Sequence, residues 1–228
     1  MSEGAETTLA PTPERILQLL AWGEFEVEGL IPWSSNATLL VTVQDAGLSM
    51  LAVYKPQQGE RLLWDFEYGS LGKREVAAYV VSDALGWDLI PPTVLRVGPY
   101  GLGSVQFFIQ AQEDAHYFTI RHEACYEPDL MRLAAFDVLT NNADRKSGHC
   151  LLDQRGGLWA IDNALTFHAE PKLRTVIWDF AERPLPDDVL DGLETLKTAV
   201  LRRTAYSRAL AGLLSEQEVA VLCDRVER

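Results

Sequence analysis

The sequence predicts an α+β protein whose first half is rich in β-strands and whose second half is mostly helical. Two apolar hairpin patterns, at residues 39–54 and 93–109, flank one strongly helical stretch at residues 71–85. Amphipathic helical patterns dominate the chain after residue 186. With 228 residues and 47% hydrophobic content, the chain can build the core of one large domain or of two lobes.

The N-terminal segment should form a short helix followed by three strands. Residues 1–11 are small, polar and poor in apolar side chains, which predicts disorder. Thr12 can then cap a helix that has Pro13 in its first turn, and Gly23 ends this helix. Apolar runs bounded by turn residues predict the strands, at residues 24–31, 39–43 and 48–54.

The helix at residues 71–85 carries apolar side chains at helical spacing and meets a stop signal at Gly86. A second hairpin pairs residues 93–97 with residues 104–109 across a glycine-rich turn. Residues 113–127 are polar and are predicted to be irregular. The remaining predicted elements are a helix at 128–140, a small hairpin made of 149–152 and 158–161, and helices at 187–201, 202–213 and 215–226.

Polar side chains gather at both ends of the small hairpin. Asp144 precedes its first strand and Asp162 follows its second strand, so the hairpin should bring these two carboxylates together. Asn142 and His149 lie beside them in the sequence. Because oxygen ligands with one imidazole suit Mg²⁺ or Mn²⁺ carrying phosphate groups, the sequence predicts a metal and phosphate site here.

The same stretch resembles a known enzyme family. Asn-x-x-Asp-Arg at residues 141–145 and Ile-Asp-Asn-x-Leu-x-Phe at residues 161–167 are similar to the catalytic core of phosphatidylinositol 3/4-kinase-like enzymes, and the type II phosphatidylinositol 4-kinases look closest. The resemblance implies a two-lobed protein-kinase-like fold with a β-rich N-lobe and a mostly helical C-lobe. It also implies ATP as a substrate, Asp144 in the catalytic loop and Asp162 as a metal ligand. The family usually has Asn where this chain has His149, and an imidazole favours Mn²⁺ over Mg²⁺.

Lys55 lies at the end of an apolar strand, where burying an unpaired cation is costly. The kinase-like pattern places a Lys on such a strand, where it pairs with the ATP phosphates and with a helix Glu. Glu75, in the first turn of the helix at 71–85, is positioned to be that partner. Two alternatives are an edge Lys that guards against aggregation and a Glu that favours the helix N-terminus. We favour the pair because Lys55 otherwise lacks an obvious partner.

Two further segments are candidates for ATP contacts. Ser35 and Asn36 lie in a small polar turn whose hydroxyl and amide groups can hold a phosphate tail, although no Walker motif is present in the sequence. By the resemblance, Phe108, Ile109 and Gln110 match the hinge whose backbone binds adenine. The same resemblance divides the chain into an N-lobe and a C-lobe, at residues 12–110 and 111–228.

Charge and composition limit the partners. A net charge of −13 disfavours binding to nucleic acid and to anionic membrane surfaces. Residues 168–186 contain no run of cations that could bind a phosphoinositide head group. No apolar run approaches the roughly 18 residues of a spanning helix, so we expect no integral membrane association. Three widely spaced cysteines suit a reducing cytoplasm.

The sequence thus predicts a cytoplasmic ATP-dependent phosphotransferase that uses Mg²⁺ or Mn²⁺. Its acceptor should be a hydroxyl on a protein or a soluble small molecule rather than a membrane lipid. Asp144 would accept or steer this hydroxyl, and the adjacent Arg145 would keep the carboxylate ionised. The alternatives are a nucleotide-binding pseudokinase with a regulatory or scaffold role, which His149 and the missing glycine-rich loop favour, and a phosphatidylinositol kinase.

Overall fold

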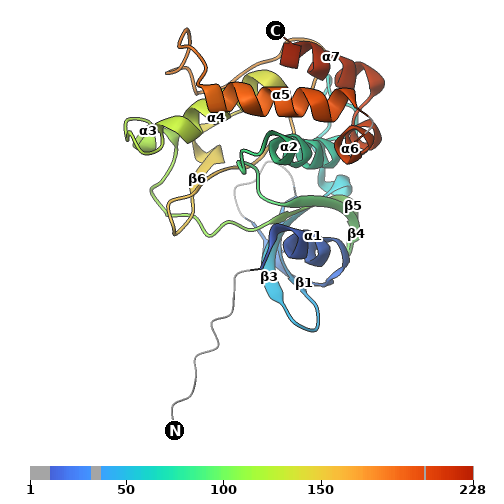
Figure 1. Ribbon diagram of the computed structural model, residues 1–228. Coiled ribbons are helices and arrows are strands. Elements are labelled where there is room, and N and C mark those ends of the chain that lie inside the picture. The colour runs from blue at the N-terminus through green and yellow to red at the C-terminus, as the bar shows by residue number, and fades with distance from the viewer. Residues whose placement is uncertain (1–10, 32–36, 203, 228) are drawn as a thin grey trace.

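The computed structural model describes residues 11–31, 37–202 and 204–227. The chain has a two-lobed α+β fold, as the sequence predicted. In Figure 1, the β-sheet and helix α1 lie at one end of the molecule and the helices α4 to α7 lie at the other end. Helix α2 lies between these two parts. None of the helices in the described part of the chain is long and apolar enough to cross a membrane.

The N-terminal lobe is built on a five-stranded sheet. Its strand order is β1-β2-β3-β5-β4, and every neighbouring pair is antiparallel. Helix α1 packs against this sheet, and its predicted cap is confirmed because the Thr12 hydroxyl accepts the backbone N–H of Arg15 at 3.3 Å. The elements are α1 (Pro13–Trp22), β1 (Glu24–Leu30), β2 (Leu39–Gln44), β3 (Ser49–Pro56), β4 (Thr93–Gly98) and β5 (Gly101–Phe107).

Alternation along the strands gives this lobe its core. Every second residue of β2 is buried, and Val41 and Val43 are fully inaccessible to solvent. They pack in one cluster with Leu19 and Leu20 of α1. The outer strand β1 instead has no buried residue, which matches the wet face that its alternating glutamates predicted.

Helix α2 (Leu71–Leu85) has the predicted bounds. It ends at Gly86, whose φ of 66° lies in the left-handed region that glycine adopts without strain. Eleven of its residues are buried, since the helix contacts β4 and β5 on one side and α5 and α6 on the other (Figure 1). Because α2 lies between the sheet and the helical lobe, it can fix the position of one relative to the other.

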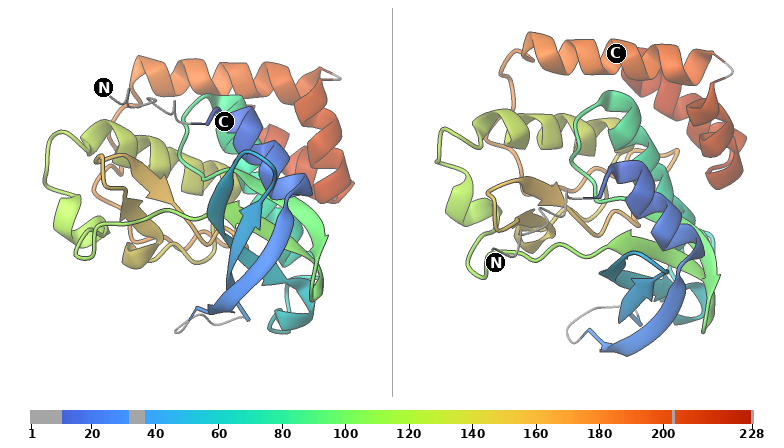
Figure 2. Two further views of the ribbon diagram at one scale, coloured as in Figure 1. Left: turned by 90° about the horizontal axis from the view of Figure 1, so that it is seen from below. Right: turned by 60° about the horizontal axis from the view of Figure 1, so that its bottom comes forward.

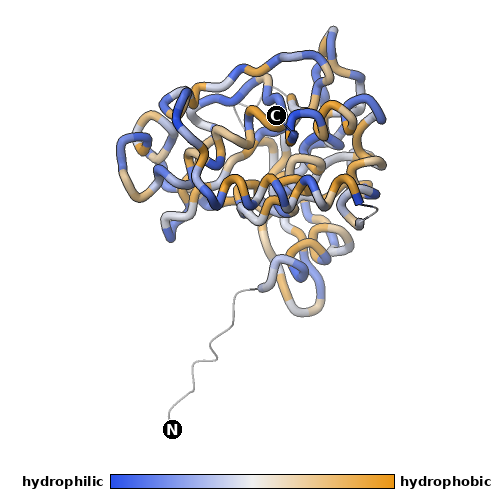
Figure 3. Tube along the Cα trace, turned by 45° about the horizontal axis from the view of Figure 1, so that its top comes forward, coloured by the Kyte–Doolittle hydropathy of each residue, from blue (hydrophilic) through white to orange (hydrophobic). Residues whose placement is uncertain are grey.

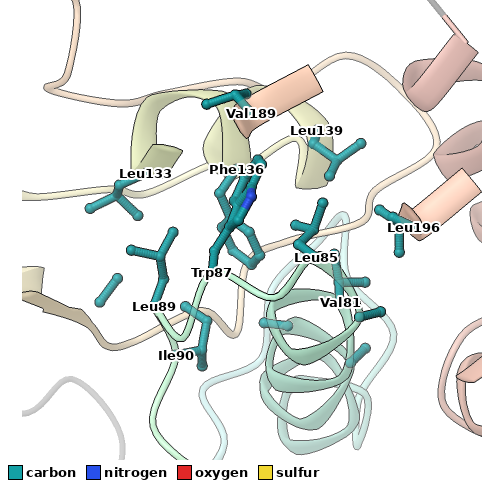
Figure 4. Close-up of a cluster of buried hydrophobic side chains, with 14 of the residues drawn as sticks. Val81, Leu85, Trp87, Leu89, Ile90, Leu133, Phe136, Leu139, Val189 and Leu196 are labelled. Carbon is teal, nitrogen blue, oxygen red and sulfur yellow. The ribbon is translucent and has the colours of Figure 1, made fainter. Parts of the chain in front are cut away.

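The C-terminal lobe packs its helices against one another, and residues of a small hairpin join their hydrophobic core. Figure 4 shows part of the shared core, in which Trp87, Leu89 and Ile90 from the segment after α2 meet Phe136 of α4 and Val189 of α5. The elements are α3 (Tyr117–Ile120), α4 (Glu127–Thr140), β6 (Cys150–Leu152), β7 (Leu158–Ala160), α5 (Asp187–Leu201), α6 (Ala205–Leu213) and α7 (Glu216–Glu227), with short 3₁₀ helices at Gln57–Gly59 and Ser147–His149.

Two local predictions differ from the structure. The turn of the second hairpin is tighter than predicted, because Gly98 already pairs with Gly101, which has a φ of 93°. The segment 113–127 is not wholly irregular, because it contains α3 with a fully buried Tyr117. Figure 2 shows the chain after β5 running from the sheet across to α3. In Figure 3, hydrophobic and hydrophilic stretches alternate along both lobes, as amphipathic elements require.

Candidate active site

An ion triad centred on Lys55 joins the two lobes. Lys55 Nζ, near the end of β3, lies 2.5 Å from Oε1 of Glu75 on α2 and 3.0 Å from Oδ1 of Asp162, which follows β7. The predicted Lys55–Glu75 pair is therefore present, and Asp162 joins it. Burial alone would lower the pKa of Lys55, but the two carboxylates outweigh burial and raise it. Lys55 is thus a cation at neutral pH despite being only 22% exposed.

Glu75 fixes this arrangement with its second oxygen. Its side chain is only 2% exposed, and Oε2 accepts the backbone N–H of Asn163 at 3.1 Å. One carboxylate thereby connects the sheet lobe, through Lys55, with the segment that carries Asp162. A rigid support of this kind holds reactive groups within the small tolerance that phosphoryl transfer needs.

Asp162 has an unusual backbone and an acidic side chain. Its φ of 59° lies in the left-handed region, which is uncommon for residues other than glycine and tends to occur at functional sites. The ammonium group of Lys55 lowers the pKa of Asp162 to about 2. At 41% exposure the carboxylate remains open to a ligand while it is held ionised.

The triad lies at one side of a cavity of about 420 Å³ between the lobes. Of the three residues of the predicted hinge, Phe108 and Ile109 line this cavity, whereas Gln110 is exposed and does not line it. The predicted phosphate-binding pair, Ser35 and Asn36, lies outside the described residues. The cavity walls are mostly apolar, which suits a planar base, while Lys55 and Asp162 provide the charged end.

His149 lies next to Asp162, as predicted. Its Nε2 is 3.4 Å from Oδ2 of Asp162, and its Nδ1 accepts the backbone N–H of Lys146 at 3.4 Å. Burial lowers the pKa of His149 to about 4, so the ring is neutral near pH 7. Because Nδ1 accepts this N–H, the neutral ring carries its proton on Nε2. The two atoms, 3.4 Å apart, can both reach one ion at metal–ligand distances of about 2.1 Å once the ring proton moves to Nδ1 and the Lys146 hydrogen bond breaks.

Asn142, the third predicted metal ligand, is engaged elsewhere. It is fully buried, its Nδ2 donates to Oδ1 of Asp137 at 3.0 Å, and its Oδ1 accepts the backbone N–H of Asp144 at 3.0 Å. Both ends of the amide are therefore used to shape the loop that carries Asp144. Within residues 11–31, 37–202 and 204–227, no group of three or more His, Cys, Asp or Glu side chains is arranged to hold a metal ion.

The donor set nevertheless fits a metal that arrives with a nucleotide. Mg²⁺ sites in kinases typically use one or two carboxylates and take further oxygens from the substrate phosphates and water. Asp162 supplies one ionised and accessible carboxylate, and His149 supplies a neutral imidazole beside it. A two-residue set of this kind is sufficient only if phosphates complete it.

Asp144 lies in the loop after α4 with a cation on each oxygen. Arg174 donates to Oδ1 at 2.5 Å, and Lys146 Nζ lies 2.7 Å from Oδ2. The expectation that Arg145 would be the cation beside Asp144 is wrong, because the buried carboxylate of Asp137 binds the Arg145 guanidinium instead.

Arg145 is fully buried and forms an ion pair with Asp137 of α4, at 3.0 Å from Nη2 to Oδ1. It also donates to the backbone oxygen of Ile161 at 2.9 Å and to Oδ1 of Asn163 at 2.6 Å. Asp137 completes its hydrogen bonds with Asn142 and with the Thr175 hydroxyl, at 3.0 and 2.9 Å. This network ties the Asp144 loop to the Asp162 segment.

A second cavity of about 280 Å³ adjoins the first on the Asp144 side. Asp162 and Lys146 line both cavities, whereas Asp144 lines only the second. The hairpin of β6 and β7 thus brings the two predicted carboxylates to one cavity. Sequence reasoning missed three cations that line it, namely Arg61, Lys146 and Arg174.

The chain has a relative in Mycobacterium tuberculosis, although no protein-family model matches the chain. Protein Rv2133c of Mycobacterium tuberculosis (strain ATCC 25618 / H37Rv) is 38% identical over 242 residues, covering 92% of this chain and 86% of that protein.

Three solved structures share the architecture at low identity. The Helicobacter pylori proinflammatory kinase CtkA has a TM-score of 0.52 at 10% identity, covering 91% of this chain and 97% of its own. Hydra Fam20 with sugar has a TM-score of 0.57 at 13% identity, covering 94% and 86%. The Golgi casein kinase with Mn/ADP bound has a TM-score of 0.53 at 15% identity, covering 94% and 73%. At such identities these matches confirm the protein-kinase-like fold that the motifs predicted, and they do not extend to the phosphatidylinositol 4-kinase likeness.

Proposed function

The chain belongs to the family of Protein Rv2133c and has a protein-kinase-like fold, and we propose that it is an ATP-dependent phosphotransferase that moves the γ-phosphate to a hydroxyl acceptor. One observation carries this proposal. Lys55 is fixed between Glu75 and Asp162, at 2.5 and 3.0 Å, beside a cavity of about 420 Å³. A half-buried Lys held between two carboxylates is costly as mere structure and is well suited to binding phosphates.

Each residue then has a role in the reaction. The base of ATP occupies the apolar part of the 420 Å³ cavity, and Lys55 binds the phosphates while Glu75 orients it. Asp162 and His149 would hold Mg²⁺ or Mn²⁺, which supplies neutralisation of phosphate charge. Asp144 accepts the proton of the acceptor hydroxyl, whose oxygen forms the new bond to the γ-phosphorus as the bond to ADP breaks.

The acceptor is proposed to be a protein or a soluble small molecule, and the compartment to be the cytoplasm. A net charge of −13 supports this choice over an anionic membrane surface. Phosphatidylinositol kinase activity, the finer reading of the motifs, is the alternative that a lipid assay addresses. The name Protein Rv2133c states no activity, so the choice of acceptor is argued from the residues of this chain.

A pseudokinase is the second candidate, and two observations favour it. Both oxygens of Asp144 are held by cations, and the metal site has His149 where the resembling family has Asn. A binding-only protein would take up ATP and metal without releasing ADP. Measuring ADP release over hours, with and without added acceptors, separates the two candidates.

Thermal unfolding with ATP and Mn²⁺ tests the proposal. Saturation at about a hundredfold over Kd should stabilise the fold by roughly 2–3 kcal/mol, a rise in Tm of about 5–10 °C for a chain of this length. Asp162→Asn should remove most of the contribution of the metal and leave the Tm without ligands close to that of the parent, because Asn tolerates the left-handed backbone of this position. Asp188→Asn, which alters only a surface ion pair with Arg132, is the matched control. If neither Mg²⁺ nor Mn²⁺ with millimolar ATP changes the Tm of the parent protein, the nucleotide site assignment fails.

A further inference from the structure

We propose that the acceptor is a small soluble polyol that carries a phosphate group beside its reactive hydroxyl, and that Arg174 binds this phosphate. The inference rests on the phosphotransferase function proposed above. It specifies the class of acceptor from the 280 Å³ cavity next to Asp144.

The cations of this cavity come from three separate segments. Arg61 lies in the insert after β3, Lys146 follows the Asp144 loop, and Arg174 precedes Thr175. Two carboxylates, Asp144 and Asp162, line the same cavity. Since Asp162 is already paired with Lys55, Asp144 is the carboxylate that Lys146 and Arg174 share, which leaves one positive charge of these two for an anionic ligand to neutralise.

The pairing of Asp144 limits how an acceptor can enter. Arg174 contacts Oδ1 and Lys146 contacts Oδ2, so a hydroxyl that donates to either oxygen of this carboxylate comes next to one of these cations. Lys146 also lines the nucleotide cavity, where a γ-phosphate can retain it. Arg174 lines the acceptor cavity and not the nucleotide cavity, so Arg174 is the cation of this pair that is free to turn to a group on the acceptor.

The side chain of Arg174 is able to move without disturbing the loop. It is 75% exposed, and exposed ion pairs are weak. Its backbone stays fixed, because its N–H donates to the Asn142 oxygen at 2.8 Å and its oxygen accepts the N–H of Arg145 at 3.0 Å. A guanidinium leaves one carboxylate most readily when another anion accepts it, and a phosphate binds its two N–H groups in parallel.

The size of the cavity favours a small molecule. A volume of about 280 Å³ is at the lower end for ligand pockets, and its walls include the apolar side chains of Leu63, Leu71 and Leu165. A phosphorylated sugar or polyol matches this combination of one anion, one hydroxyl and apolar faces. In the proposed step the hydroxyl proton passes to Asp144, the γ-phosphate moves from ADP to the hydroxyl oxygen, and the first phosphate stays on Arg174.

Calorimetry on the full chain tests this inference. The protein is first loaded with Mn²⁺ and a non-hydrolysable ATP analogue, so that the phosphate sites of the nucleotide cavity are filled. Glycerol 3-phosphate, myo-inositol 1-phosphate and glucose 6-phosphate are then titrated beside glycerol, myo-inositol and glucose. At least one phosphorylated compound should bind about tenfold or more tightly than its neutral parent, as expected for charge-assisted hydrogen bonds.

Variants identify the residue. Arg174→Gln should remove most of the phosphate preference, and Arg174→Lys should keep part of it, because a Lys retains the charge but not the fork. Arg183→Gln is the matched control, since Arg183 lies in the same segment, is 45% exposed and pairs with Glu127 instead. It should bind all ligands as the parent does.

The outcomes separate this inference from the proposed function. If the analogue does not bind, the phosphotransferase proposal fails and the inference fails with it. If the analogue binds but no phosphorylated compound is preferred, or if the preference persists in Arg174→Gln, only the inference is overturned. Labelled ATP supplies two further arms: label found only in vesicle phosphatidylinositol 4-phosphate overturns a soluble acceptor, and label found in a glutamate-flanked serine peptide but in no polyol phosphate overturns a small one.

Discussion

The Asp137–Arg145 pair should be a major determinant of stability as well as of loop geometry. Both side chains are fully buried, and Arg145 donates five hydrogen bonds, three to Asp137 and one each to Ile161 and Asn163. Arg145→Met would leave the Asp137 carboxylate buried with only two neutral donors, Asn142 and Thr175. Removing one partner of a buried ion pair typically costs about 3–5 kcal/mol. For a chain of this length that corresponds to a loss of about 6–20 °C in Tm.

Urea unfolding followed by tryptophan fluorescence measures this loss, since the chain has six tryptophans. Arg132→Met is the matched control, because Arg132 pairs with Asp188 at 2.5 Å but both side chains are partly exposed, at 29% and 48%. Its cost should not exceed about 1 kcal/mol. Adding Asp137→Asn to Arg145→Met removes the buried charge, so the double variant should be more stable than Arg145→Met alone. A loss in Arg145→Met no larger than that of Arg132→Met would refute the reasoning.

Two further predictions concern His149 and the cysteines. His149→Asn should shift the metal preference of nucleotide binding from Mn²⁺ towards Mg²⁺, because an amide oxygen replaces an imidazole. The measurement is the ratio of the Tm shifts that ATP causes with each metal. An unchanged ratio would indicate that His149, whose Nδ1 already accepts the Lys146 N–H, only orients Asp162. Cys125 is exposed and should react with a thiol reagent at pH 8. Cys150 should react only on unfolding, because burial raises the pKa of its thiol to about 12. Equal reaction rates for the two cysteines would contradict the burial of Cys150.

Local signals predicted most of the fold. The bounds of α2 were predicted correctly because its apolar spacing and the stop at Gly86 are both local features of the chain. The turn of the β4–β5 hairpin was not, because Gly98 packs against the ring of Tyr54 and this contact depends on the sheet. The buried Tyr117 of α3 was missed for the same reason: it lies in a polar stretch, and only tertiary packing buries it.

The sequence predicted some residues of the candidate site and missed others. Lys55 and Glu75 were found because a cation in an apolar strand requires a partner, and the motifs supplied one. Arg61, Lys146 and Arg174 were missed because no local pattern connects residues so far apart in the chain. The partner of Arg145 was misassigned by adjacency. The sequence does not show that Asp137, eight residues earlier on α4, offers Arg145 a buried carboxylate, and Lys146, two residues after Asp144, takes the place expected of Arg145.

The acidic composition of the chain and a phosphate-binding cavity are compatible. At physiological ionic strength, charges separated by more than about 8 Å are largely screened in solvent. A phosphate at Asp144 would therefore respond mainly to the nearby cations that line the cavity and only weakly to the net charge of −13. The net charge still acts at long range on large anionic surfaces, which present many charges at once. The two effects together favour a small phosphorylated acceptor over an anionic membrane.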